Sequence, residues 1–90
     1  MQIVNVVEKM VWDKMDAVLA KKQDICQCEK CRADIAAYAL NKLKPRYVAS
    51  SRGEVFVKAQ YMDVGLAADV LVALTEAAEV VGKNPKHDKE

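Results

Sequence analysis

All three cysteines of this 90-residue chain, Cys26, Cys28 and Cys31, fall within six positions. They stand among glutamine, glutamate and lysine, in a polar stretch that is poorly suited to filling a hydrophobic core. Thiolates are soft ligands, and zinc is the ion that clustered cysteines most commonly hold in a structural role. The two-residue spacer between Cys28 and Cys31 lets both sulfurs reach one tetrahedral ion, and Cys26 can supply a third. The cysteine turn, over residues 23–30, is therefore predicted to bind a metal ion together with Cys31 directly after it.

Three thiolates leave one position of a tetrahedral zinc ion open. His87 is the only histidine in the chain, and Pro85 beside it would stiffen the polar tail. We predict a structural zinc site of Cys26, Cys28, Cys31 and His87 that pins this tail to the cysteine turn. The alternatives for the fourth ligand are water, a group oriented by the backbone, or a residue from another chain. Two other interpretations of the thiols stay open, namely three reduced thiols in a loop or a redox pair made by Cys28 and Cys31.

Hydrophobic residues at steps of three and four predict two helices on either side of the cysteine turn. The first helix is expected over residues 3–22, with Asn5 able to cap its start. Lys21 and Lys22 would then occupy its last turn, where cations favour the carbonyl end of the helix dipole. The second helix is expected over residues 30–43 and ends before a Lys-Pro pair, because the residue before proline avoids the α region.

A third helix is expected over residues 63–82, again from its apolar periodicity. Asp63 is the predicted N-cap, and Gly82 the left-handed residue just after the helix end. Residues 44–53 are expected to form a loop. Residues 54–61 alternate as a short strand would, but a lone strand has no partner in one copy of the chain, which favours a helix or an extended connector.

Length and composition predict a single globular domain, with 52% hydrophobic and 30% charged residues. We expect an all-α domain of three main helices and a short connecting segment over residues 1–83, followed by a polar tail over residues 84–90. The first and last helices carry more apolar surface than one short domain can cover, which predicts a homodimer. No apolar run is long enough for a signal sequence or a membrane span. An odd number of cysteines fits a reducing compartment, so we expect a cytoplasmic protein with no membrane contact.

Two sequence features occur together: Cys-X-Cys-X-X-Cys opening a helix, and Asn41-X-Leu43-X-Pro45-X-Tyr47-Val48 after it. This combination, with an Ala-Ala-Glu-Val-Val segment near the C-terminus, resembles the late competence development protein family, ComFB. The resemblance implies a small helical homodimer with a zinc ion on each cysteine cluster and no catalytic activity. It also implies a fourth cysteine ligand near the C-terminus in the Bacillus-type member, where this chain has His87. Cyanobacterial relatives are receptors for cyclic dinucleotides.

Positive charge is concentrated between residues 41 and 58, where Glu54 is the only acid. Arginine binds phosphate through paired hydrogen bonds, and aromatic rings stack on bases. Together with the family resemblance, this pattern predicts a site for cyclic di-GMP or cyclic di-AMP, formed by Lys42, Lys44, Arg46, Tyr47 and Arg52. The alternative is an ordinary solvated face, in which Arg46 caps helix carbonyls and Tyr47 packs in the core. The patch is small and the net charge is only +1, which disfavours nucleic-acid binding.

Catalytic signatures are missing from the sequence. No histidine stands beside a nucleophile, and no glycine-rich phosphate loop or carboxylate pair in an apolar setting is found. We therefore expect a non-enzymatic regulatory protein with a structural zinc ion and a cyclic dinucleotide as its ligand. The alternative is a protein–protein interaction module with a structural zinc ion and no small-molecule ligand.

Overall fold

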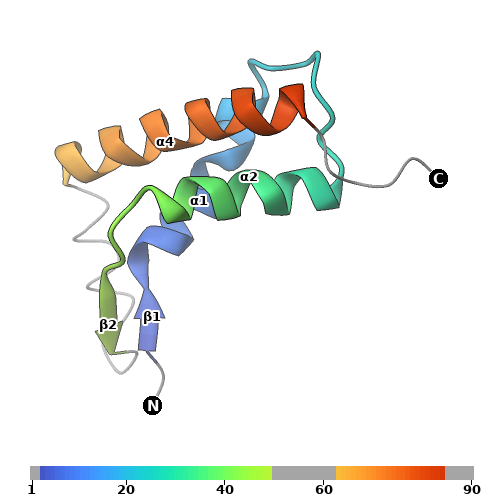
Figure 1. The fold of residues 1–90 in the computed structure, drawn as a ribbon. Coiled ribbons are helices and arrows are strands. Elements are labelled where there is room, and N and C mark those ends of the chain that lie inside the picture. The colour runs from blue at the N-terminus through green and yellow to red at the C-terminus, as the bar shows by residue number, and fades with distance from the viewer. Residues whose placement is uncertain (1–2, 50–62, 85–90) are drawn as a thin grey trace.

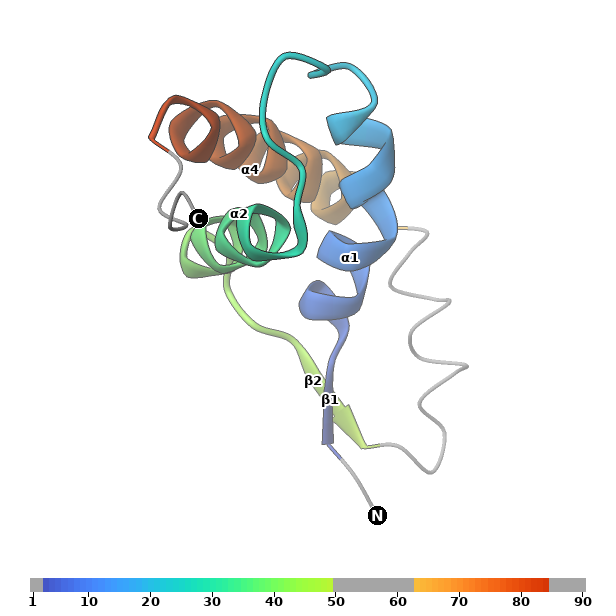
Figure 2. The ribbon, with the colours of Figure 1, turned by 90° about the vertical axis from the view of Figure 1, so that its right-hand side faces the viewer.

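Three helices and a two-stranded ribbon make up the part of the chain that the computed structural model describes, residues 3–49 and 63–84. The elements run in the order β1 (Ile3–Asn5), α1 (Val6–Leu19), α2 (Glu29–Asn41), β2 (Tyr47–Ala49) and α4 (Val64–Lys83). Helices α2 and α4 lie side by side and run in opposite directions, while α1 crosses them (Figure 1, Figure 2). The three predicted helices are thus confirmed, and the domain is mostly helical.

Helix α1 is shorter than predicted, because it begins at Val6 and ends at Leu19 instead of spanning residues 3–22. The predicted cap is confirmed, since Oδ1 of Asn5 accepts a hydrogen bond from the backbone N–H of Val7 at 3.1 Å. Lys21 and Lys22 therefore lie beyond the last turn, contrary to the prediction. Seven apolar residues of this helix are buried: Val6, Val7, Met10, Val11, Met15, Val18 and Leu19.

Strand β1 pairs antiparallel with β2, and the two form a ribbon that projects from one end of the helices (Figure 1). The register sets Ile3 opposite Ala49 and Asn5 opposite Tyr47. The prediction of an all-α class agrees with the mostly helical domain, but it did not include this short ribbon. Strand β2 lies within the loop expected over residues 44–53, of which residues 50–53 are outside the described residues. The sequence places more than forty residues between the two strands, and local patterns carry no information on such a pairing. Residues 54–61, for which a helix or connector was expected, lie outside the described residues.

Helix α4 begins one residue later than predicted and ends one residue later, at Lys83. The predicted cap is confirmed, because Oδ1 of Asp63 accepts from the backbone N–H of Leu66 at 3.1 Å. The prediction for Gly82 was wrong: this residue lies inside the helix, and no glycine in the described segments has a positive φ. A Cβ atom at Gly82 would lie 2.6 Å from Cγ2 of Ile25, so close approach of the cysteine turn explains the glycine.

The hydrophobic core lies where the three helices meet. Its largest fully buried side chains include Met10, Met15, Leu19, Ile35 and Leu74. Alanines line much of the contact between α2 and α4, which lets these two helices approach closely. Among the described residues, no helix has both the length and the apolar character to span a membrane.

Candidate functional site

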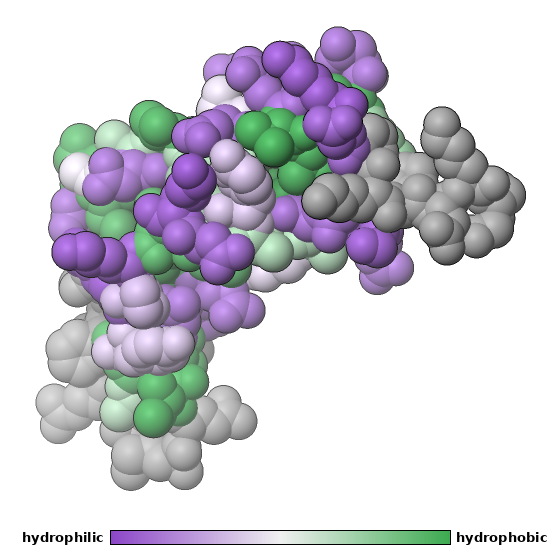
Figure 3. Space-filling model, viewed as in Figure 1, coloured by the Kyte–Doolittle hydropathy of each residue, from purple (hydrophilic) through white to green (hydrophobic). Residues whose placement is uncertain are grey.

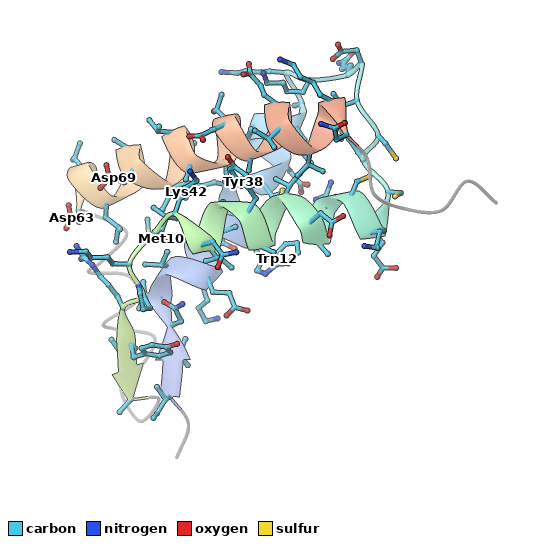
Figure 4. All side chains as sticks on the ribbon, in the orientation of Figure 1. Met10, Trp12, Tyr38, Lys42, Asp63 and Asp69 are labelled. Carbon is cyan, nitrogen blue, oxygen red and sulfur yellow. The ribbon has the colours of Figure 1, made fainter. Side chains whose placement is uncertain are left out.

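The three cysteine side chains converge at the N-terminal end of α2, as the sequence predicted. Their Sγ atoms all lie within 4.8 Å of one another. The yellow sulfur atoms gather there beside the connection between α1 and α2 (Figure 4). Cys28 is exposed, Cys26 is half-buried and Cys31 is buried. Three sulfurs at this separation fit the donor set of a soft metal ion such as zinc, so the cluster could hold one.

Local structure explains how the sulfurs come together. Cys28 is the N-cap of α2 with extended backbone angles, and its Sγ accepts from the backbone N–H of Cys31 at 3.5 Å. Gln27 closes the preceding helix, because its side-chain amide donates to the carbonyl oxygens of Leu19 at 2.9 Å and Lys22 at 3.0 Å. These bonds add to the backbone hydrogen bonds that Leu19 and Lys22 already accept from Lys22 and Ile25, and they tie Gln27 to the end of α1 and the turn after it. Local sequence patterns did not indicate that the Gln27 side chain makes these hydrogen bonds.

The thiols differ in acidity. The backbone N–H of Cys31, followed by the thiol of Cys26, lowers the pKa of Cys28 to about 7, because both donate to its thiolate form. Burial raises the pKa of Cys31 to about 12, since it disfavours the charged form. Cys28 is thus partly ionised at neutral pH, whereas Cys31 without a metal ion stays protonated. A bound cation would offset the cost of ionising the buried thiol.

A second feature is a hollow of about 520 Å³ between the end of α2 and the first half of α4, here called the cationic hollow. Three of the predicted ligand-binding residues, Lys42, Lys44 and Arg46, line it together. Tyr47, predicted as a ligand-binding residue, does not line it, and the alternative of a core position does not hold either, because 64% of its surface is exposed on β2. His87 and Arg52, the other predicted site residues, lie outside the described residues. The rest of the lining is Leu43, Leu66, Asp69, Val72, Ala73 and Glu76.

Carboxylates of the last helix balance the positive charge of this hollow. Nζ of Lys42 lies 3.7 Å from Oε2 of Glu76 and 5.4 Å from the ring centre of Tyr38, whose hydroxyl donates to Glu76 at 3.0 Å. Nη1 of Arg46 lies 3.4 Å from Oδ2 of Asp63. Figure 4 shows Tyr38 and Lys42 between α2 and α4, with Asp63 at the start of α4. Two cations of this basic stretch, Lys42 and Arg46, are therefore paired with carboxylates in the fold, which sequence position alone did not reveal.

Arg46 also holds the junction of three elements through its backbone. Its N–H donates to Oδ1 of Asn5 at 3.0 Å, and its carbonyl accepts from the N–H of Val6 at 2.7 Å. The pKa of Asp63 lies below its usual value, mainly because its carboxylate accepts a hydrogen bond from the N–H of Leu66. The guanidinium of Arg46 lowers this pKa further. Arg46 is thus a structural residue as well as part of the lining of the hollow.

The chain and its fold have known relatives. A family model described as late competence development protein ComFB matches residues 4–85. This chain belongs to the ComFB family. The competence protein ComFB of Bacillus subtilis (strain 168) is 31% identical over 83 residues, covering 92% of this chain and 85% of that protein. A solved structure of the late competence protein ComFB from Bacillus subtilis matches with a TM-score of 0.80 and 30% identity, covering 94% of this chain and 96% of that one. The resemblance seen in the sequence is confirmed.

Proposed function

We propose that this ComFB-family protein is a non-enzymatic regulatory protein that carries a structural zinc ion and acts by binding. The observation that supports the zinc ion is the meeting of three sulfurs within 4.8 Å at one end of α2. Cys26, Cys28 and Cys31 would hold the ion as thiolates, and His87 is the proposed fourth ligand. Zinc would add the cross-link that a short chain with a small core needs.

Zinc quantification on the purified protein tests this proposal. We expect one zinc ion per chain, lost in the variant Cys31→Ser. His87→Ala should keep the ion but bind it more weakly if the tail supplies the fourth ligand, whereas His87→Cys should restore tight binding. A protein that is fully folded and free of metal would contradict the structural zinc ion. Equal zinc affinity in His87→Ala and the wild type would exclude His87 as the fourth ligand but would leave the proposal of a zinc ion on the three cysteines standing.

We also propose that the protein is a homodimer. In support, α4 exposes apolar side chains on the side away from the core, including Val64, Leu71 and Val72. Hydrophobic residues lie in patches among hydrophilic ones along the face in Figure 3. Light scattering should give twice the 10.0 kDa chain mass. Val72→Glu should shift the particle towards one chain, while the control Lys9→Glu on α1 should not. A wild-type particle of one chain at low micromolar concentration would refute the dimer.

The finer proposal is that the protein is a cyclic-dinucleotide receptor that uses the cationic hollow. Lys42, Lys44 and Arg46 offer phosphate contacts beside an apolar floor, although a nucleotide must compete with the carboxylates that already pair with two of these cations. Calorimetric titration with cyclic di-GMP and cyclic di-AMP is the test. We expect binding that Lys44→Ala weakens and that the control Lys30→Ala, at the other end of α2, leaves unchanged.

The alternative function is a protein–protein interaction module with a structural zinc ion and no small-molecule ligand. Two observations favour it: the charge balance within the hollow and the exposed apolar side chains of α4. Absence of calorimetric heat with both nucleotides, in zinc-loaded wild-type protein, would decide for this alternative. Binding of either nucleotide, weakened by Lys44→Ala, would decide for the receptor.

A further inference from the structure

The connection between α1 and α2 is fastened to the last two turns of α4. Ile25 packs directly on Gly82, so closely that a Cβ atom at Gly82 would lie 2.6 Å from its Cγ2. Nζ of Lys22 lies 3.0 Å from Oε2 of Glu79, one turn earlier on α4. Figure 1 shows the connection, in cyan, running beside the red end of α4. The position of this connection therefore decides how the end of α4 is covered.

The thiols adjoin the residues that make these contacts. Cys26 directly follows Ile25, and Gln27 lies between Cys26 and Cys28. Gln27 donates to the carbonyl oxygens of Leu19, the last residue of α1, at 2.9 Å and of Lys22, just beyond it, at 3.0 Å. A change in the positions or bonding of the thiols would be transmitted through one or two peptide units to the packing on Gly82 and to the closure of α1.

Two neighbouring thiols differ in exposure, because the thiol of Cys28 faces solvent and that of Cys31 is buried. Cys28 is exposed, whereas Cys31 is 1% exposed, and their sulfurs lie within 4.8 Å. They occupy the N-cap and the third residue of α2, so both side chains lie on one side of the first turn. A disulfide needs the sulfurs at about 2.05 Å, so these side chains must move closer together from their present separation. A bridge between Cys26 and Cys28 would close a ring around a single residue, which is less favourable.

We propose that the cysteine turn is a site of reversible thiol oxidation, in which a hydroperoxide converts Cys28 and Cys31 into a disulfide and thereby loosens the connection from the end of α4. The thiolate of Cys28 attacks one peroxide oxygen, the O–O bond breaks, and a sulfenic acid and hydroxide result. The sulfur of Cys31 then attacks the sulfenic sulfur and expels water as the S–S bond forms. Two thiols are oxidised and one hydrogen peroxide is reduced to two waters.

The structural consequence follows from the bonds that the disulfide weakens or removes. Disulfide formation removes the charge from the Cys28 sulfur, which weakens the N-cap hydrogen bond that it accepts from the N–H of Cys31. Where the thiolates hold a zinc ion, which rests on the proposed function, two of its ligands are lost at once; two protons are taken from solvent, and the ion is released. Cys26 is then no longer cross-linked, and Ile25 beside it can leave Gly82. Oxidation would thus uncover apolar surface between α1 and the end of α4.

The experiment uses the full chain, reduced and with its zinc content measured beforehand, exposed to a small molar excess of hydrogen peroxide. Remaining thiols are then alkylated and the disulfide is mapped by mass spectrometry. We expect a bond between Cys28 and Cys31, one alkylated Cys26, and several-fold faster hydrogen exchange in residues 20–28 and 79–84. A thiol reductant should reverse the change, which separates it from methionine oxidation.

Variants make the outcome decisive. Cys28→Ser keeps an N-cap acceptor in place and should abolish the peroxide effect on exchange, whereas Cys26→Ser should still form the disulfide. Failure to form this bond, or a bond that leaves exchange at 79–84 unchanged, would overturn the proposal. If the protein proves metal-free but shows the bond and the faster exchange, the switch stands and the zinc proposal falls. If zinc is bound and the pair resists peroxide, the switch falls and the zinc proposal stands.

Discussion

The contact between Gly82 and Ile25 determines whether Gly82→Ala raises or lowers the free energy of unfolding. Replacing Gly82 with alanine would set a Cβ atom 2.6 Å from Cγ2 and 3.1 Å from Cβ of Ile25. Carbon atoms prefer about 3.5–4.0 Å, so the cysteine turn must shift by roughly 1 Å. Such overpacking costs about 1–3 kcal/mol. Alanine recovers up to about 1 kcal/mol of helix propensity at the same position, so Gly82→Ala should lower the free energy of unfolding by about 1 kcal/mol.

The matched control is Gly65, near the start of the same helix. Among the described residues, a Cβ atom there would meet only Oδ1 of Asp63, at an ordinary 3.5 Å, so Gly65→Ala should be neutral or stabilising by up to about 1 kcal/mol. A double-mutant cycle then isolates the contact. In an Ile25→Ala background the 2.6 Å contact is removed and only the 3.1 Å approach to the Cβ atom of residue 25 remains, so Gly82→Ala should become close to neutral, which gives a coupling of roughly 1 kcal/mol.

Thermal or urea unfolding measures all of these variants, at one protein concentration and one zinc concentration, because binding equilibria shift the apparent stability. For a domain of this size, about 1 kcal/mol corresponds to a change in Tm of roughly 4–8 °C. If Gly82→Ala stabilises the wild-type chain as much as Gly65→Ala does, Ile25 does not approach α4 as described. Zero coupling in the cycle would lead to the same conclusion.

The helix caps and the thiols give three more expected outcomes. Asn5→Ala should cost about 1–2 kcal/mol in urea unfolding, because Oδ1 accepts from the N–H groups of both Val7 and Arg46, while Asn5→Asp should largely retain stability. The pKa of Asp63 is lowered on folding, so its stabilisation is complete above the usual value of 3.8 and is lost as pH falls through the folded value. Asp63→Asn keeps a capping oxygen, and its Tm should therefore fall less steeply below about pH 4 than that of the wild type. In metal-free protein, alkylation of Cys28 should rise through its pKa of about 7; a midpoint near 9 would contradict the hydrogen bond from Cys31.

Local sequence patterns determined the helices, two of their caps and the meeting of the thiols. Apolar spacing along a helix, an Asn or Asp before its first turn, and a Cys-X-X-Cys at its start act over only a few residues. Asn5 and Asp63 were therefore identified as caps before the fold was known. The convergence of the sulfurs of Cys28 and Cys31 follows from the same short range, and the motifs on either side were enough to indicate the family.

Tertiary structure decided everything that depends on residues far apart in the chain. The pairing of β1 with β2 joins segments more than forty residues apart. Short strands with weak alternation of apolar and polar residues do not indicate which segment they pair with. In sequence, Lys42 and Arg46 belong to a basic patch. In the fold, Glu76 on α4 pairs with Lys42, and Asp63, the N-cap of α4, pairs with Arg46. In sequence, Gly82 has the position of a residue that ends a helix. In the fold, a glycine is needed there because the side chain of Ile25, fifty-seven positions earlier, packs against it. Such contacts arise from packing and chain closure, which a local pattern cannot encode.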